Sequence, residues 1–477
     1  MRTEHDALGS RSIDDRLYYG IQTSRALENF SISGKTISDI PHFVSSLIRI
    51  KQAAALANLD AGALGRDVAT AIVEAGEHWL AHGDATQFCV DIYHGGGGTA
   101  ANMNINEVLA NRANEILTGH KGYDVVHPNT HVNMAQSTND VIPSAMKLAT
   151  HMQLGALDDA MILLTDALGR KEGEFSHVVK IARTCLQDAL PITLGQEFSG
   201  YRSGCERLLD EARTIRRRCL HIPLGATAVG TGFGTRAGYR VNALAHLRRL
   251  SGLDITPESN LFDGLQNADQ WIGAAAALKA IGLLLSKISN DLRLLSSGPK
   301  AGLGEIELPA VQPGSSIMPG KVNPVIPEMM MQVYFRILGN DATIARACEG
   351  ELDLNVWESA IMNAISEAIT LLSRSIPIFV EKCLNGIEAN VAVCRAHAEA
   401  SLALAAVIAS LHDYPKAVAV ARHAEKNGGS AKKAAVELDV LTEDQANEVF
   451  AAAVFTDIGE FHRICGSFPT TATARKA

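Results

Sequence analysis

The segment from Gly314 to Pro324 gathers side chains that bind anions and move protons. It reads Gly-Ser-Ser-Ile-Met-Pro-Gly-Lys-Val-Asn-Pro, so hydroxyls, an ammonium and an amide lie close together in sequence. Its glycines and prolines favour turns over regular structure, and a lysine among several donors suits a carboxylate ligand. The residues alone support two interpretations about equally: a mobile loop that binds an anion and abstracts a proton, or an ordinary surface loop rich in serine and glycine.

A second cluster of donors lies at Gln136–Asp140, which reads Gln-Ser-Thr-Asn-Asp and precedes a predicted helix. Ser, Thr, Asn and Asp are the preferred N-caps of helices. Hydroxyls and free N–H groups at a helix start also form a site for a carboxylate. The two interpretations are compatible, so this cluster is a candidate anion site as well as a cap.

Two further segments carry a threonine in a suggestive context. Thr99 follows the glycine run Gly95–Gly98, which is a poor phosphate loop because no Gly-Lys-Ser/Thr follows and no strand precedes it. Thr184 is followed by Cys185. We interpret this cysteine as a buried apolar residue rather than a nucleophile, since nothing nearby in the sequence obviously activates the thiol.

Taken together, these segments resemble the aspartase/fumarase superfamily. Gly314–Pro324 is similar to the signature sequence of that superfamily, and its continuation Val325–Glu328 resembles the aspartase branch more than the fumarase branch. The similarity extends over nearly the whole chain, including Tyr18–Thr23, Glu28–Phe30 and Thr193–Phe198. The resemblance implies an all-α fold, a fumarase-type elongated helical bundle with small N- and C-terminal domains, and a homotetramer whose core consists of long helices.

The resemblance also implies a reaction, the reversible deamination of L-aspartate to fumarate and ammonia through an aci-carboxylate intermediate. Ser315 is then the base that takes the C3 proton, with Lys321 as the second catalytic residue. The implied substrate-binding residues are Thr99, Ser137, Thr138 and Ser316 at the C4 carboxylate, Thr184 and Asn323 at the C1 carboxylate together with Lys321, and Asn139 and Cys185 near the leaving group. No cofactor and no metal is implied, because the substrate's own carboxylate takes up the developing charge.

Three positions depart from the implied pattern. Cys185 stands where fumarases carry histidine and aspartases histidine or glutamine, which argues against a hydratase. Ala100 and Ala101 stand where relatives of the aspartase type usually carry at least one hydroxyl or larger residue, so we expect a wider amine side that suits a substituted amine. Ala406–Ala409 stands where the family usually has a Thr-Ala-Leu-Asn-type segment. Three functions therefore stay open. Aspartate ammonia-lyase leads, followed by fumarate hydratase or another C4-dicarboxylate lyase, such as one for N-substituted aspartate, and more remotely by a non-catalytic structural or binding tetramer.

Apolar residues recur at helical spacing almost everywhere, so helices must position these segments. From Trp271 onward, one buried stripe is marked by Ala274, Leu278, Ile281, Leu285, Ile288 and Leu292. Similar long helices are predicted at 143–169, 201–219, 327–348 and 354–385, several with proline near the first turn, where its missing N–H costs little. We expect a mostly helical N-terminal domain at 1–139, a central long-helix bundle at 140–393 and a small helical C-terminal domain at 394–477.

Bulk composition limits the classes of partner. The 477 residues carry a net charge of −9, with no basic block longer than Arg216–Arg218, so neither nucleic acid nor lipid is an expected partner. The polar N-terminus lacks the apolar core of a signal peptide, and the apolar stretch Ile272–Leu285 is interrupted by Lys279 and too short to span a bilayer. We expect a cytoplasmic protein that acts on a small dicarboxylate.

Three other patterns carry less weight. The eight cysteines are scattered without a Cys-x-x-Cys pair, which predicts reduced, mostly buried thiols. His127 and His131 have the spacing of a helical metal pair, but Pro128 interrupts the helix and no acidic ligand follows, so no metal site is predicted. Gly230–Gly234 hints at a dinucleotide loop, yet no βαβ unit surrounds it and a plain loop is expected.

Overall fold

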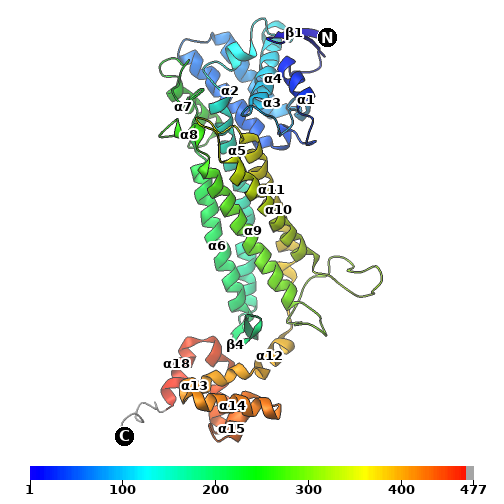
Figure 1. Cartoon of the computed structure of the whole chain (residues 1–477), viewed down its shortest axis with the longest axis vertical. Helices are drawn as coiled ribbons and strands as arrows, with labels where there is room; N and C mark the ends of the chain where they lie inside the picture. Colours follow the sequence, from blue (N-terminus) through cyan, green and yellow to red (C-terminus); the bar gives the residue numbers. More distant parts are fainter. Residues whose placement is uncertain (469–477) are drawn as a thin grey trace. The chain divides into compact units, whose positions relative to one another are not determined.

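A computed structural model of the chain describes residues 1–468, and these residues confirm the predicted all-α fold (Figure 1). The α-helices are α1 (Ile21–Asn29), α2 (Pro41–Asp60), α3 (Arg66–His82), α4 (Thr99–Thr118), α5 (Thr138–Glu174), α6 (Leu194–Arg218), α7 (Tyr239–Ser251), α8 (Asp263–Gln266), α9 (Asp269–Leu295), α10 (Val325–Ala347), α11 (Glu358–Lys382), α12 (Val391–Ala400), α13 (Ala406–Leu411), α14 (Tyr414–Asn427), α15 (Ala431–Glu437), α16 (Glu443–Val449), α17 (Ala452–Thr456) and α18 (Ile458–Ser467).

Strands are short and pair two by two. They are β1 (Arg2–Asp6) with β2 (Gly9–Ile13), β3 (Val179–Thr184) with β4 (Gln187–Thr193), β5 (His221–Ile222) with β6 (Thr256–Pro257), and β7 (Ile306–Glu307) with β8 (Glu388–Ala389). The β5–β6 pair is parallel and the other three are antiparallel. The β3–β4 hairpin was not predicted from the sequence, and it carries Thr184 at its tip.

The chain divides into two compact units. Unit 1 comprises Met1–Ala160, Leu208–Leu283 and Val333–Arg374, and unit 2 comprises Met161–Arg207, Leu284–Gln332 and Ser375–Ala477. The expected division at residues 139 and 393 remains a prediction. The expected C-terminal domain, 394–477, also includes residues 469–477, which lie outside the described part of the chain.

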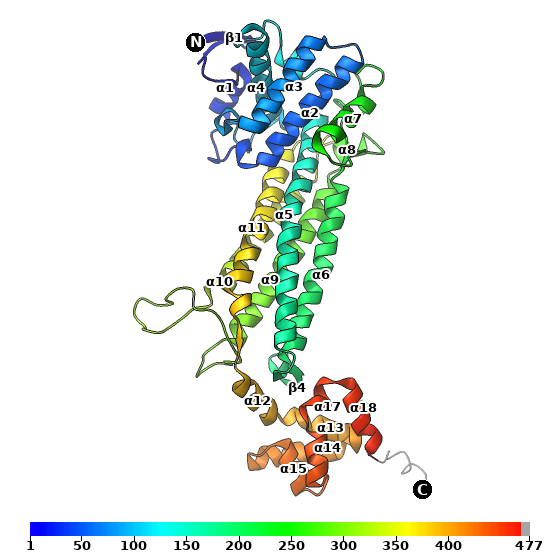
Figure 2. The ribbon, with the colours of Figure 1, turned by 180° about the vertical axis from the view of Figure 1, so that it is seen from behind.

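The five long predicted helices appear as α5, α6, α9, α10 and α11. α5 and α6 lie side by side in unit 1, where Arg216 Nη1 pairs with Asp158 Oδ2 at 2.7 Å (Figure 2). Small residues allow close packing: a Cβ added at Gly282 of α9 would lie 3.1 Å from the ring of Tyr334 on α10. One detail was wrong, because α5 begins at Thr138 and Pro143 therefore lies inside the helix rather than in its first turn.

The expectation for the apolar stretch of α9 needs correction. The helix runs for 27 residues, and by length and composition alone it is apolar enough to cross a membrane. It is longer than the apolar stretch because polar residues at both ends continue the helical hydrogen bonding. Of its most apolar window, 56% is buried inside the protein, as expected for a core helix.

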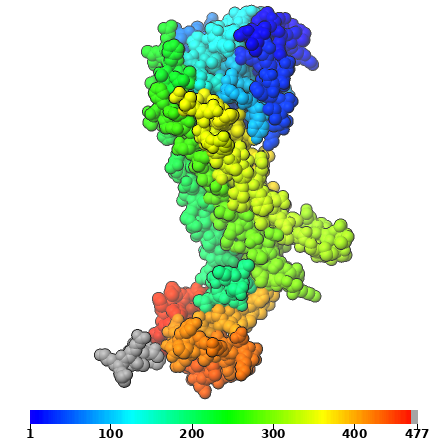
Figure 3. Space-filling view, in the orientation of Figure 1, coloured from blue at the N-terminus to red at the C-terminus, as the bar shows by residue number. Residues whose placement is uncertain are grey.

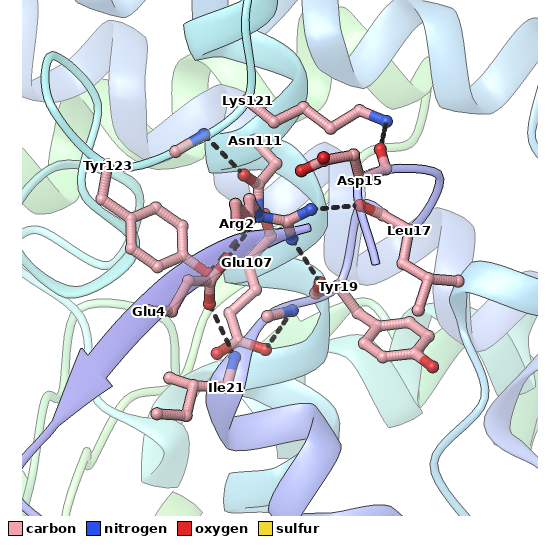
Figure 4. A network of polar contacts seen from close by, with 12 residues as sticks. Arg2, Glu4, Asp15, Leu17, Tyr19, Ile21, Glu107, Asn111, Lys121 and Tyr123 are labelled. Carbon is pink, nitrogen blue, oxygen red and sulfur yellow. Dashed lines mark hydrogen bonds and ion pairs between the residues drawn. The ribbon is translucent and has the colours of Figure 1, made fainter. Parts of the chain in front are cut away.

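Unit 1 ties its N-terminal segment to α4 through a polar network (Figure 4). Arg2 donates to the carbonyls of Leu17 and Tyr19, both at 2.8 Å. The buried carboxylate of Glu107 on α4 accepts from the backbone N–H groups of Gly20, Gln22 and Thr23 and from the Thr23 hydroxyl. These bonds fix α4, whose first residue is Thr99, against the segment Tyr18–Thr23.

Unit 2 combines the β3–β4 hairpin with the C-terminal helices. β3 packs against α12, and β4 packs against α17. The buried carboxylate of Glu305 accepts from Arg183 of β3 at 2.7 Å and from His397 of α12 at 2.9 Å. Apolar side chains of α13 to α18 form a separate small core around Ile408, Val420 and Ile464.

Candidate active site

The start of α4 presents Thr99 at the edge of a cleft. The cleft has a volume of about 680 Å³, and its lining includes Gln22, Arg25, Thr99, Ala100, His127 and Asn129. The N-cap Gly98 has φ +86°, and a Cβ there would lie 2.7 Å from Ile142 of α5, so a side chain would meet both backbone strain and a clash. Glycine at this position therefore lets the starts of α4 and α5 meet.

The start of α5 holds the second donor cluster in a fixed geometry. The fully buried carboxylate of Asp140 accepts from the N–H of Ser137 at 3.0 Å and from the N–H groups of Gly225 and Thr227 at 2.9 and 3.0 Å. The Asn139 amide donates to the carbonyl of Ala228 at 2.7 Å. Burial raises the pKa of Asp140, while these N–H donors lower it. These contacts order the start of α5, and its role as an anion site stays a prediction.

The β3–β4 hairpin presents Thr184 and Cys185 in unit 2. Cys185 and Leu186 form the turn with φ of +54° and +60°, both in the left-handed region. The expectation of a buried Cys185 was wrong for this chain, because a side chain at the tip of a two-residue turn points to solvent and Cys185 is exposed. Of the eight cysteines, the four fully buried ones are Cys205, Cys219, Cys383 and Cys394.

The signature segment forms a loop between α9 and α10 that stands away from the helices of unit 2 (Figure 1, Figure 3). Gly314 closes its base: the Gly314 N–H donates to the Lys321 carbonyl, and the Asn323 amide donates to the Gly314 carbonyl, both at 2.8 Å. A Cβ at Gly314 would lie 2.6 Å from the Asn323 backbone nitrogen. Only glycine permits this closure.

Within the loop, the hydroxyl of Ser315 is held by backbone donors. Its Oγ accepts from the N–H groups of Ile317 at 3.2 Å and Met318 at 3.1 Å. Two donors on one oxygen favour its deprotonated form. Ser316 and Lys321 are exposed, and within the described residues Lys321 forms no ion pair, so its charge is available to a ligand.

The predicted site residues fall into two groups. Thr99, Ser137, Thr138 and Asn139 belong to unit 1, and Thr184, Cys185, Ser315, Ser316, Lys321 and Asn323 belong to unit 2. In unit 1 the first two segments meet directly, since the Asn102 amide of α4 donates to Thr138 Oγ1 at 3.1 Å. In unit 2, no hydrogen bond or ion pair within residues 1–468 joins the Thr184 hairpin to the Ser315 loop.

Sequence reasoning missed the buried charges beneath these segments. Lys51 is fully buried and donates to Asn133 Oδ1 at 2.9 Å; burial lowers its pKa to about 7, while the nearby Asp140 carboxylate works in the opposite direction. Lys180, Arg183 and Glu305 form a second cluster below Thr184. Arg183 directly precedes the predicted site residue Thr184, and this neighbouring charge was the sequence signal that could have indicated the cluster.

The histidine pair set aside as a metal site has a different role. His127 caps a short π-helical turn, Pro128–Val132, and its backbone N–H donates to His131 Nδ1 at 2.9 Å. Within residues 1–468, no group of three or more His, Cys, Asp or Glu side chains is placed to hold a metal ion. The two histidines therefore shape the turn next to the cleft.

The fold and these segments define a helical lyase. A family model described as Lyase matches residues 10–339, and the chain belongs to this family. It is similar to the aspartate ammonia-lyase of Helicobacter pylori strain 26695, with 42% identity over 94% of this chain and 97% of the relative. The aspartate ammonia-lyase of Bacillus subtilis strain 168 is 43% identical over 93% of this chain and 94% of the relative.

Solved structures agree with this assignment. A fumarate lyase:delta crystallin from Brucella melitensis, bound to cobalt, superposes with a TM-score of 0.91 at 41% identity, covering 98% of this chain and all of that one. A class II fumarase from Schistosoma mansoni superposes with a TM-score of 0.92 at 33% identity, covering 96% of this chain and 99% of that one. The predicted superfamily resemblance is confirmed.

Proposed function

We propose that this protein is an aspartate ammonia-lyase, which converts L-aspartate reversibly to fumarate and ammonia. The observation that carries the proposal is the Ser315 oxygen, which accepts two backbone N–H bonds in a loop that also presents Lys321, a residue with no ion pair within residues 1–468. Relatives at 41 to 43% identity over almost the whole chain carry that name.

The chemistry begins with the C3 proton of the substrate. A free serine hydroxyl is too weak an acid to be ionised near neutral pH, so its use as a base requires local stabilisation of the alkoxide. The N–H groups of Ile317 and Met318 supply two donors, and the Lys321 cation adds charge stabilisation. Ser315 then takes the proton as the loop closes over the substrate and excludes water.

The carbanion is stabilised by spreading its charge into the C4 carboxylate, which becomes an aci-carboxylate. Its oxygens need donors where the charge develops. Thr99, Ser137, Thr138 and Ser316 supply four hydroxyls, and the start of α4, which has no side-chain cap, adds free N–H groups. The C1 carboxylate is bound by Lys321, Asn323 and Thr184. This second anchor orients the substrate so that its C3 proton faces Ser315.

Ammonia leaves from C2 on the side of Asn139 and Cys185. Asn139 is oriented by its bond to the Ala228 carbonyl, which leaves its amide oxygen for the ammonium group. Cys185 offers no imidazole to orient a water molecule, which favours ammonia over water as the leaving group. An exposed Cys185 at the tip of a hairpin also leaves space on this side.

Assembly and location belong to the same proposal. The long helices expose large apolar residues, among them Leu283 at 53%, Phe335 at 57% and Ile378 at 45%. Apolar side chains left exposed along the central helices support contacts between subunits there. We infer a homotetramer in the cytoplasm that acts on a small dicarboxylate and binds neither nucleic acid nor membrane.

Replacement of the base tests the mechanism. Ser315→Ala should lower kcat by roughly 10²-fold or more, the scale of general-base catalysis, while KM for L-aspartate changes little. Ser316→Ala, one residue along in the same loop, should affect KM as well as kcat, because its hydroxyl binds the ground state too. A Ser315→Ala enzyme with more than about a tenth of the parental kcat would show that another group removes the proton.

A further inference from the structure

Four polar side chains form a hydrogen-bonded cluster beneath the two donor segments of unit 1. Lys51 of α2 and both Asn102 and Asn106 of α4 donate to one oxygen of the half-buried Asn133. The side chains of Lys51, Asn102 and Asn106 are all at most 1% exposed. The mechanism proposed above uses none of these four residues, although Asn102 donates to the hydroxyl of Thr138, a proposed substrate-binding residue.

The orientation of the Asn133 amide is fixed from both ends. Its Nδ2 donates to the backbone carbonyl of Gln136 at 3.3 Å, and a carbonyl can only accept. Its Oδ1 therefore faces the other way, where it accepts from Lys51 Nζ at 2.9 Å and from the amides of Asn102 and Asn106, each at 3.2 Å. The reversed orientation of the Asn133 amide is excluded, because it would place an NH₂ group against three donors.

The orientation of Asn102 follows from that of Asn133. If the Asn102 amide were turned over, its oxygen would face the Asn133 oxygen, and two acceptors would meet without a proton. The Asn102 Nδ2 must therefore point toward Asn133, and its second hydrogen reaches Thr138 Oγ1 at 3.1 Å. This orientation has a cost, because the buried Asn102 oxygen has no hydrogen-bond partner among residues 1–468.

We propose that Asn102 is a positioning residue that holds the Thr138 hydroxyl as a donor toward the C4 carboxylate. Because Thr138 Oγ1 accepts from the Asn102 amide and no acceptor for its own proton is found within residues 1–468, that proton is free to be donated to a substrate carboxylate. The hydroxyl is thus preorganised to donate where negative charge develops in the transition state. This proposal rests on the proposed function, in which Thr138 binds the substrate.

The chain offers a matched control. Asn106 is the same residue type on the same helix, equally buried, and bonds to the same Asn133 oxygen at the same distance, yet no bond to Thr138 is described for it. Asn102→Ala should lower kcat about 10-fold with little change in KM, whereas Asn106→Ala should leave kcat within about twofold. Asn102→Asp should also lower kcat, since a carboxylate would attract the Thr138 proton to itself.

A second readout separates orientation from general damage. 3-Nitropropionate forms a nitronate that mimics the aci-carboxylate, so its inhibition constant should rise in Asn102→Ala by about the factor by which kcat falls. The inhibition constant of succinate, a ground-state analogue, should change far less. Equal weakening of both inhibitors would indicate a distorted site and overturn the proposal. Thermal melting of each variant checks that the helices remain folded.

A double-mutant cycle with Thr138→Val completes the test. On the Thr138→Val background, Asn102→Ala should cost no further activity, because the hydroxyl that it orients is gone. Independent losses in the double mutant would overturn the proposal, as would an Asn106→Ala enzyme as impaired as Asn102→Ala. If Thr138→Val keeps full kcat on L-aspartate, the substrate role assigned to Thr138 is wrong while the lyase activity stands. If the parent chain releases no fumarate, the proposed function itself fails.

Discussion

Arg183, the residue before Thr184 in the β3–β4 hairpin, donates from Nη2 to the fully buried carboxylate of Glu305 at 2.7 Å. Lys180 pairs with the same carboxylate at 3.2 Å, and His397 of α12 donates to it from Nδ1 at 2.9 Å. These contacts lower the pKa of Glu305 although burial raises it. One carboxylate thus ties the hairpin that carries Thr184 to the first helix of the C-terminal segment.

Glu305→Gln should destabilise unit 2 and misplace Thr184. Removing one partner of a buried ion pair leaves the other charges uncompensated, at a cost of about 3–5 kcal/mol. We expect a lower melting temperature and a higher KM for L-aspartate. Glu307→Gln, two residues along and exposed, is the control and should behave like the parent. Equal melting temperatures and KM values for the two variants would show that the buried cluster does not position the hairpin.

The pKa of Lys51 predicts a specific pH dependence of stability. The unfolded chain keeps its proton on Lys51 up to about pH 10.5, whereas the folded protein releases it near pH 7. Over that interval the unfolded state binds more protons, so this residue makes the free energy of unfolding rise with pH, by up to about 1.4 kcal/mol per pH unit. Lys51→Met should remove that rise in denaturant titrations between pH 7 and 10. Identical slopes in parent and variant would mean that Lys51 titrates normally.

Cys185 should tolerate substitution. Its backbone lies in the left-handed region, which asparagine adopts more readily than most residues, so Cys185→Asn should keep or slightly raise the melting temperature. Cys185→Ser removes only the thiol and should change kcat/KM by less than about threefold. Loss of more than about a hundredfold in Cys185→Ser, with an unchanged melting temperature, would assign the thiol a part in the chemistry.

Much of this fold could be predicted because the long helices bury one apolar stripe, and a 3.6-residue period is visible in sequence. The donor segments could be predicted because hydroxyls and amides cluster around glycines and helix starts. The β3–β4 hairpin was missed, since two short strands joined at Cys185 and Leu186 lack an Asn-Gly or Gly-rich turn. The bond from Asn102 to Thr138 joins residues 36 apart and depends on how α4 packs on α5, which no local pattern encodes.

Complementation between mutant subunits tests whether each site of the proposed homotetramer combines segments from different subunits. Thr138→Ala and Ser315→Ala subunits, each nearly inactive alone, should regain activity when refolded together. Random mixing places both intact segments in roughly a quarter of the sites of a closed oligomer. Activity no greater than the sum of the two parents, with subunit exchange confirmed by native mass spectrometry, would show that each site is built within one chain.

All the residue roles proposed above depend on one reaction, the elimination of ammonia from L-aspartate. The most direct measurement follows fumarate absorbance after L-aspartate, L-malate or an N-alkylaspartate is added separately to the purified full-length protein. We expect fumarate to form fastest from L-aspartate, with matching release of ammonia, and this activity to be lost in Ser315→Ala. Fumarate formed faster from L-malate or from the N-alkylaspartate, or from none of the three, would contradict the account.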